Sequence, residues 1–181
     1  MFVVVLSFVL GSIPFGVLVA KQRGVDIKAH GSGNIGATNV TRVLGLGAGA
    51  IVLLLDAGKG ALAVWIASRY CTPWVIAAAG FAAILGHCFS PWLGGKGGKG
   101  VATALGVFVI LAPPLAAIAV LIFAAVLAVT RVPALGSIAG TMAIALILVY
   151  RTDRPYAALA CATVALMLYT HRTNLAKLKA R

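Results

Sequence analysis

Long apolar segments follow one another along almost the whole chain, and this feature limits the possible folds more than any other. A helix that crosses a membrane needs about 20 apolar residues, with about 17 as a lower limit. Hydrophobic residues make up 62% of the sequence and charged residues 10%, whereas soluble domains carry about 25% charged residues. We therefore predict an all-α, polytopic integral membrane protein. The predicted spans are Met1–Ala20, Leu46–Ser68, Pro73–Phe89, Val101–Ala112, Leu115–Val129, Pro133–Tyr150 and Tyr156–Thr170.

Two of these segments are short, and between them lie Pro113 and Pro114, which break a helix. Residues 101–129 are too many for a single span, so two short tilted helices with a turn at the prolines are predicted. This gives seven spans, with six as the alternative. The first segment, Met1–Ala20, lacks the basic start and the small-residue cleavage site of a signal peptide, which favours a retained membrane helix.

The distribution of basic residues predicts the orientation, because Lys and Arg are enriched in cytoplasmic loops. With seven spans and an outward N-terminus, eleven of the 15 basic residues fall on the inner side. Three, Arg69, Arg151 and Arg154, fall outside, and Lys59 lies within a span. An outward N-terminus and a cytoplasmic C-terminus are therefore predicted. The inner residues are Lys21, Arg23, Lys28, Arg42, Lys96, Lys99, Arg131, Arg172, Lys177, Lys179 and Arg181.

Acidic residues are very scarce, which excludes several kinds of chemistry. The chain has three aspartates, Asp26, Asp56 and Asp153, and no glutamate, and its formal net charge is +12. A carboxylate-bound metal or a pair of catalytic carboxylates has little material here. Partners are expected to be lipid headgroups or a phosphorylated substrate rather than nucleic acid, and no metal or cofactor is predicted. The three cysteines, Cys71, Cys88 and Cys161, are widely spaced, as small apolar core residues would be.

The first of two glycine-rich loops is residues 31–39, with the sequence Gly-Ser-Gly-Asn-Ile-Gly-Ala-Thr-Asn. Its glycines allow backbone N–H groups to close around an anion. The polar residues Ser32, Asn34, Thr38 and Asn39, followed by Arg42, supply hydroxyl, amide and guanidinium donors. A plain alternative is a turn that leads into a helix capped by Thr38 or Asn39. Because a cap needs only one such residue, we predict a phosphate cradle.

The second glycine-rich loop, residues 94–100, carries Lys96 and Lys99 among glycines and runs into an apolar helix. The N-terminus of a helix offers unpaired N–H groups and partial positive charge to an anion. The loop does not match the G-x-x-x-x-G-K-[ST] pattern, because neither lysine is followed by Ser or Thr. ATP hydrolysis is therefore not expected. The alternative is a flexible basic linker that attracts anionic lipid.

Other polar residues lie close to these loops in the predicted topology. His87 stands near the cytoplasmic end of the third span, and it either contacts substrate or packs at the helix end. No histidine begins a His-x4-Asp acyltransferase motif. Asp56 and Lys59 form an i, i+3 pair inside the second span, which either joins helices, as we favour, or borders a cavity.

Both loops, the segment from Arg131 to Ser137 and the tail from His171 to Asn174 all fall on the predicted cytoplasmic side. Four polar clusters that are far apart in sequence thus share one membrane face, and we expect them to converge on one site. No internal repeat is visible, so residues 1–181 are expected to form one domain.

The motifs resemble those of the bacterial membrane glycerol-3-phosphate acyltransferases that use acyl phosphate as donor. Residues 32–39 with Arg42 are similar to the first motif of that family, and residues 86–89 with 96–103 to its second. Arg131 to Ser137 is similar to its third motif, and the tail from His171 to Asn174 to its C-terminal signature. The chain departs from the family at Ala134, where a serine is usual, at Gly95, where an aromatic residue is usual, and in lacking acidic residues near its end.

The resemblance implies transfer of an acyl chain from acyl phosphate to the 1-hydroxyl of glycerol 3-phosphate. Because acyl phosphate is already activated, we predict direct attack with no acyl-enzyme. In this hypothesis Arg42 and Lys99 stabilise the departing phosphate, and Ser32, Ser137 and the Lys96–Gly100 loop help to cradle it. His171 and Asn174 are implied to hold glycerol phosphate. The remaining expected substrate or phosphate contacts are Gly33, Asn34, Thr38, Asn39, His87, Lys96, Gly97, Gly98, Gly100 and Thr103.

The same resemblance implies a bacterial inner-membrane enzyme whose site faces the cytoplasm, together with a soluble enzyme that supplies acyl phosphate. The main alternative from another class is a transporter of a phosphorylated metabolite or lipid. A transporter is expected to show inverted repeats or polar residues at mid-membrane, whereas the polar clusters here gather on one predicted face.

Overall fold

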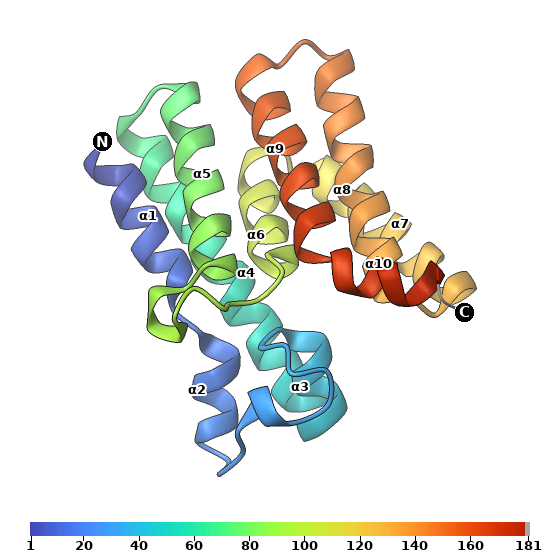
Figure 1. The fold of residues 1–181 in the computed structure, drawn as a ribbon. Helices are drawn as coiled ribbons and strands as arrows, with labels where there is room; N and C mark the ends of the chain where they lie inside the picture. Colours follow the sequence, from blue (N-terminus) through green and yellow to red (C-terminus); the bar gives the residue numbers. More distant parts are fainter. Residues whose placement is uncertain (180–181) are drawn as a thin grey trace.

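In a computed structural model, which describes residues 1–179, the chain is all-helical and the described part contains no strand (Figure 1). Arg181, one of the residues counted on the inner side, lies outside the described residues, as do the side chains of Lys177 and Lys179. The helices are α1 (Phe2–Ser12), α2 (Phe15–Lys21), α3 (Ala37–Leu44), α4 (Leu46–Tyr70), α5 (Pro73–Cys88), α6 (Val101–Leu111), α7 (Pro113–Thr130), α8 (Pro133–Tyr150), α9 (Arg154–Thr170) and α10 (Arg172–Lys179), with 3-10 turns η1 (Ile27–Ala29) and η2 (Pro91–Leu93).

The first predicted span is not one continuous helix, and in this respect the prediction over Met1–Ala20 is wrong. Helix α1 ends at Ser12, Ile13 takes an extended ψ of 119°, and α2 begins at Phe15. The cause is Pro14, which has no N–H and disfavours helical geometry at the preceding residue. The break leaves the carbonyl groups of Ser12 and Ile13 available to donors from other parts of the chain.

The predicted turn at the proline pair is confirmed. Helix α6 ends at Leu111, and α7 begins at Pro113, with both prolines in its first turn. Proline is tolerated there because the first N–H groups of a helix have no partner inside it. Helix α6 has 11 residues and is therefore about 16 Å long, which is short against a hydrocarbon layer of about 30 Å.

Five segments of the described chain are long and apolar enough to cross a membrane: Phe2–Lys21, Leu46–Tyr70, Pro73–Leu93, Pro113–Thr130 and Pro133–Tyr150. Helix α9 has 17 residues and α6 has 11. Large apolar side chains such as Leu54, Leu121 and Leu146 are exposed on these helices, as expected for surfaces that face lipid.

Close helix crossings depend on small residues. A side chain at Gly11 of α1 would overlap the backbone of Ala83 in α5, and one at Gly86 would overlap the carbonyl of Phe8. Membrane helices approach this closely where glycine replaces larger residues. Helices α1 and α5 thus pack closely against each other.

The arrangement brings distant loops to one end of the molecule (Figure 1). The connections between α4 and α5 and between α8 and α9 lie at one end of the bundle, whereas α2, α3, the loop between α5 and α6, and α10 lie toward the other. Both glycine-rich loops and the tail after α9 therefore lie in the same part of the fold.

Candidate active site

A polar cavity of about 360 Å³ lies where the two glycine-rich loops meet the end of α9. It is lined by residues of both loops, of the end of α5 and of the end of the chain. The first loop contributes Ser32, Gly33 and Asn34, and the second contributes Gly95, Lys96, Gly97, Gly98 and Lys99. Cys88 comes from α5 and Phe89 follows it, Tyr169 and Thr170 come from the end of α9, and Arg172, Thr173 and Asn174 come from the tail. Segments separated by more than 100 positions in the sequence thus form one site.

The first loop is closed by the buried side chain of Asn39. Its Oδ1 accepts a hydrogen bond from the Ser32 N–H at 2.8 Å, while its Nδ2 donates to the carbonyls of Asn34 at 2.9 Å and His30 at 3.1 Å. Gly33 has a φ of +71°, a conformation that favours glycine. Asn39 therefore shapes the loop from behind and leaves Ser32 and Asn34 at the cavity.

The rest of the first motif lies away from the cavity. The Asn34 Oδ1 accepts a hydrogen bond from the Gly36 N–H at 2.8 Å, just before α3. Gly36 is the N-cap of that helix, and no side chain caps it. Thr38 and Arg42 are both exposed on α3, and neither lines the cavity.

The second loop folds back onto the end of α5. The Gly97 N–H donates to the Cys88 carbonyl and the Gly98 N–H to the His87 carbonyl, each at 3.0 Å. A side chain at Gly97 would overlap these two carbonyls, so only glycine permits this approach. The backbone bonds fix the loop and place Lys96 and Lys99 beside the cavity.

Lys99 also contacts the tail. Its Nζ donates a hydrogen bond to the Oδ1 of Asn174 at 2.7 Å, and its carbonyl accepts one from the Thr170 hydroxyl at 3.3 Å. The Arg172 guanidinium lies 4.1 Å from the Tyr169 ring centroid, a cation–π contact. Lys96, Lys99 and Arg172 thus bring three positive charges to a cavity that no aspartate lines among the described residues, so the site favours anions.

His171 is buried directly behind the tail. Its Nδ1 lies 2.9 Å from the Met167 carbonyl, which can only accept, so Nδ1 carries the proton and Nε2 is left as an acceptor. Burial lowers the pKa of His171, and the Lys99 ammonium lowers it further, against the hydrogen bond to Met167, which raises it. The imidazole is therefore neutral at neutral pH, and it does not line the polar cavity.

A second cavity of about 210 Å³ lies among α4, α6, α7 and α8, and its lining is almost entirely apolar. It contains Ser137, whose hydroxyl donates to the Pro133 carbonyl at 2.9 Å. Val101 and Ala102 also line it and follow Lys99 directly after Gly100. The start of α6 thus separates a cationic cavity from an apolar one, an arrangement that suits a ligand with a phosphate head and an acyl tail.

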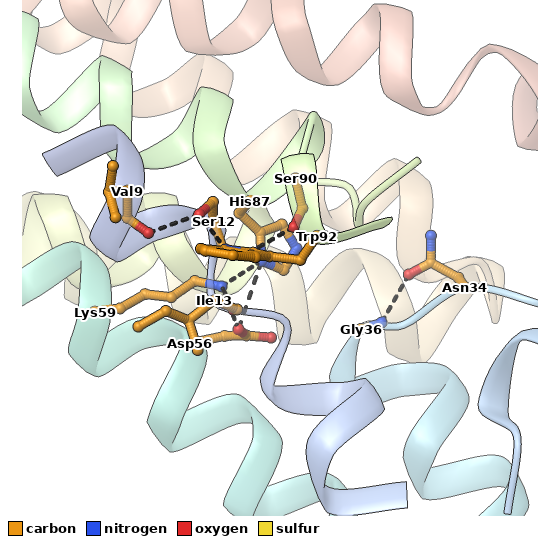
Figure 2. Close-up of polar contacts among 10 residues, drawn as sticks. All are labelled: Val9, Ser12, Ile13, Asn34, Gly36, Asp56, Lys59, His87, Ser90 and Trp92. Carbon is orange, nitrogen blue, oxygen red and sulfur yellow. Dashed lines mark hydrogen bonds and ion pairs between the residues drawn. The ribbon is translucent and has the colours of Figure 1, made fainter. Parts of the chain in front are cut away.

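Three expected site residues next to the second loop or at its end do not line the cavity. Gly100, with a φ of +82°, is the N-cap of α6. Thr103 is fully buried, and its hydroxyl makes no hydrogen bond within residues 1–179. His87 is buried against Lys59 and Asp56 and does not line the cavity (Figure 2). Within the described residues, no group of three or more His, Cys, Asp or Glu side chains is placed to hold a metal.

A model of the family described as "Glycerol-3-phosphate acyltransferase" matches residues 1–181. The chain belongs to this family. A glycerol-3-phosphate acyltransferase of Myxococcus xanthus is 52% identical over 182 residues, covering 98% of this chain and 95% of the relative.

Two solved structures described as PlsY (YgiH), an integral membrane glycerol 3-phosphate acyltransferase, have a TM-score of 0.93 to this fold. Each is 40% identical, with coverage of 99% of this chain and 91% of the other, and they are described as a glycerol 3-phosphate form and a lysophosphatidic acid form. The family resemblance in the motifs is thus confirmed, as is an integral membrane protein.

Some residues that line the cavity are not singled out by the sequence. Phe89, Tyr169, Arg172 and Thr173 line the cavity, although only the His171–Asn174 segment was named as a polar cluster. The charge of Arg172 and the hydroxyl of Thr173 indicate a place at the cavity, because both residues lie between the expected site residues His171 and Asn174. Phe89 and Tyr169 carry no such signal, because aromatic residues also belong to ordinary membrane surfaces.

Proposed function

We propose that the protein transfers an acyl chain from acyl phosphate to the 1-hydroxyl of glycerol 3-phosphate, giving lysophosphatidic acid and inorganic phosphate. The observation that carries the proposal is the cationic cavity with Lys96, Lys99 and Arg172 next to an apolar cavity. Both proposed substrates carry a phosphate, and one also carries an acyl chain. The glycerol 3-phosphate and lysophosphatidic acid forms of the solved relatives support the same acceptor and product.

In the proposed reaction, the hydroxyl oxygen attacks the acyl carbon directly. A new ester C–O bond forms, the C–O bond to the phosphate breaks, and phosphate leaves with the electron pair. The hydroxyl proton passes to the departing phosphate or to a histidine. Because acyl phosphate is already activated, positioning and charge stabilisation supply much of the barrier reduction.

Most of the proposed roles follow the two cavities. Lys99 stabilises the departing phosphate, with Ser32, Gly33, Asn34 and the Lys96–Gly100 loop around it, and Asn174, which already contacts Lys99, holds glycerol 3-phosphate. For Arg42 and His171, which do not line the cavity, the proposed contacts with the departing phosphate and with glycerol 3-phosphate rest on the resemblance of the motifs alone. The acyl chain occupies the apolar cavity, where Ser137 lies. Supporting roles remain proposed for Thr38, Asn39, His87 and Thr103.

We also propose that α1 with α2, α4, α5, α6, α7, α8 and α9 make seven spans of one domain in a bacterial inner membrane. The excess of basic residues on one side supports an outward N-terminus and a cytoplasmic C-terminus. The cavity then faces the cytoplasm, where a soluble enzyme delivers acyl phosphate.

Replacement of Ser32 or Lys99 tests the site assignment. Ser32→Ala and Lys99→Ala are expected to abolish turnover of palmitoyl phosphate and glycerol 3-phosphate, because the departing phosphate loses its donors. Loss of a preorganised donor costs about 100- to 1,000-fold in kcat. The assay measures lysophosphatidic acid from purified protein in lipid.

The matched control is Ser68→Ala, because Ser68 is exposed and its hydroxyl bonds to the Trp65 carbonyl of its own helix. This variant is expected to keep full activity, and all variants are expected to insert and unfold like the parent. Near-native turnover by Ser32→Ala or Lys99→Ala would contradict the assignment.

A further inference from the structure

Three ionisable side chains form a buried cluster that does not line the cavity (Figure 2). Asp56, Lys59 and His87 are 1%, 3% and 3% exposed. The Lys59 Nζ lies 2.7 Å from the Asp56 Oδ1, 2.8 Å from the Ile13 carbonyl oxygen and 2.9 Å from the His87 Nδ1. Lys59 therefore joins α4 to the break after α1 and to the last turn of α5.

The geometry fixes which edge of His87 faces the loop. An ammonium group has three donors and no acceptor, so Lys59 can only be the donor in its 2.9 Å contact with the His87 Nδ1. The His87 Nδ1 is then the acceptor, and the ring proton of the neutral imidazole is on Nε2. A side chain placed on Gly98 would overlap this Nε2 edge, so the imidazole lies directly against the second glycine-rich loop.

Gly98 needs to be glycine because of this contact and not because of its backbone. Its φ is not in the positive range, so another residue could adopt the conformation. Its N–H also donates to the His87 carbonyl at 3.0 Å. His87 thus contacts Gly98 through both backbone and ring, and the next residue along the chain is Lys99.

The break at Pro14 anchors the other end of the arrangement. The Ser12 carbonyl accepts a hydrogen bond from the Ser90 hydroxyl at 2.7 Å, and the Ser12 hydroxyl accepts one from the Trp92 indole at 2.8 Å. The Ile13 carbonyl accepts from Lys59. The end of α1 at the break therefore holds both the charged cluster and the segment that leads into the second loop.

We propose that Asp56 and Lys59 are positioning residues for acyl transfer, a proposal that rests on the proposed function. These two side chains hold His87 against Gly98, and this contact fixes Lys99 at the wall of the cavity. Buried charges within a membrane are costly, and apolar side chains of similar volume are often at least as stabilising. A purely structural link between helices therefore does not require the charges of Asp56 and Lys59. Control of the backbone position of Lys99 gives a reason for these charges.

The first test replaces both charges at once. Asp56→Asn with Lys59→Met leaves no unpaired buried charge but removes the ammonium donor to His87. We expect kcat per folded protein to fall about 10- to 100-fold, because small displacements of a catalytic group have effects of this size. An unchanged kcat with a lowered unfolding temperature would show a structural role only and would overturn the proposal.

A second test needs only the contact between His87 and Gly98. Gly98→Ala is expected to lower kcat about 100-fold. The double variant His87→Ala with Gly98→Ala is expected to have a kcat about 10-fold higher than Gly98→Ala alone, because it lacks the ring that the new methyl group overlaps. Gly97→Ala, alone and combined with His87→Ala, is the matched control, since its methyl group meets backbone carbonyls that His87→Ala leaves in place. The proposal predicts that His87→Ala restores kcat to the Gly98→Ala protein but not to the Gly97→Ala protein. Restored kcat in neither protein, or in both, would overturn the proposal, even if the charge variant does not fold.

A third readout does not depend on turnover. The rate of acetylation of Lys99, followed by mass spectrometry, is expected to differ several-fold between the Asp56→Asn, Lys59→Met protein and the parent protein. The rate of acetylation of the exposed Lys21 is expected to be the same in both proteins. Equal rates at Lys99 would contradict the proposal. Absence of acyl transfer in the parent protein would instead contradict the proposed function, and the acetylation result would still decide whether the cluster positions Lys99.

Discussion

The two glycine-rich loops both line the cavity, but they are held in place in different ways. The first loop is held by its own side chains, since Asn39 and Asn34 bond to backbone groups within residues 30–36. The second loop, between Gly94 and Gly100, is held by the last turn of α5 and has the buried Asp56–Lys59–His87 cluster behind it. Residue type therefore shows what a loop can bind, but not what determines its shape.

This difference has consequences for mutation. In the first loop, an amide side chain that is a candidate phosphate ligand also serves the loop itself. In the second loop, the residues that control the backbone lie on α4 and α5, outside the motif. Substitutions far from the second loop in sequence should therefore affect it, whereas the first loop should respond mainly to changes within its own motif.

The largest expected effect of breaking the first loop comes from Asn39→Asp. The carboxylate can still accept from the Ser32 N–H, but it cannot donate to the carbonyls of His30 and Asn34. Loss of two hydrogen bonds of about 1–1.5 kcal/mol each predicts a fall in kcat of about 100-fold. The measurement is turnover per folded protein, and an active Asn39→Asp variant would show that the loop does not depend on this amide.

Asn34→Ala removes a single hydrogen bond of the same loop, to the Gly36 N–H. One bond of about 1 kcal/mol predicts a smaller loss, about 5- to 10-fold in turnover. The comparison between Asn39→Asp and Asn34→Ala shows which hydrogen bonds stabilise the loop most: those of the Asn39 side chain, or the one between Asn34 and Gly36 before α3. A greater loss in Asn34→Ala would indicate that Asn34 acts chiefly on the substrate.

For the second loop, Ser90→Ala breaks its link to the end of α1. The Ser12 carbonyl then loses its bond from the Ser90 hydroxyl, while the backbone bonds of Gly97 and Gly98 remain. We expect turnover to fall about 5-fold, as for the loss of one hydrogen bond of about 1 kcal/mol. Wild-type turnover from this variant would show that the α1 break does not support the loop.

The smallest expected effect concerns pH. The pKa of His171 is lowered in the folded protein by burial and by Lys99, so the unfolded chain takes up a proton at a higher pH than the folded one. Stability is therefore full above the ordinary value of about 6.5 and falls as the pH drops below it. Thermal unfolding between pH 7.5 and 5.5 should show a weaker pH dependence in His171→Gln than in the parent. An identical pH dependence would show that His171 does not titrate differently on folding.

Much of the fold follows from the sequence because it depends on local properties. Apolar runs predicted a helix for every expected span, and the proline pair predicted the turn between α6 and α7. Pro14 was not recognised as a break, because prolines are tolerated in membrane helices when other groups satisfy the freed carbonyls. Here Ser90 and Lys59 do so, and neither is near Pro14 in sequence.

The candidate site was predictable to a similar extent. Spacing identified the Asp56–Lys59 pair, which the structure confirms as an ion pair at 2.7 Å. Its link to His87 and to the Ile13 carbonyl depends on how α1, α4 and α5 cross, and periodicity carries no information on that. In the same way, the composition of residues 31–39 pointed to anion binding, but not to Asn39 as the residue that closes the loop.

The most direct test of the account measures phosphate release by the purified protein in lipid with palmitoyl phosphate, with and without glycerol 3-phosphate. We predict release that requires the acceptor and equals the lysophosphatidic acid formed, with no product when acyl-CoA replaces palmitoyl phosphate. No acceptor-dependent release from folded protein that still binds phosphate would contradict acyl transfer in the cavity and favour transport of a phosphorylated compound.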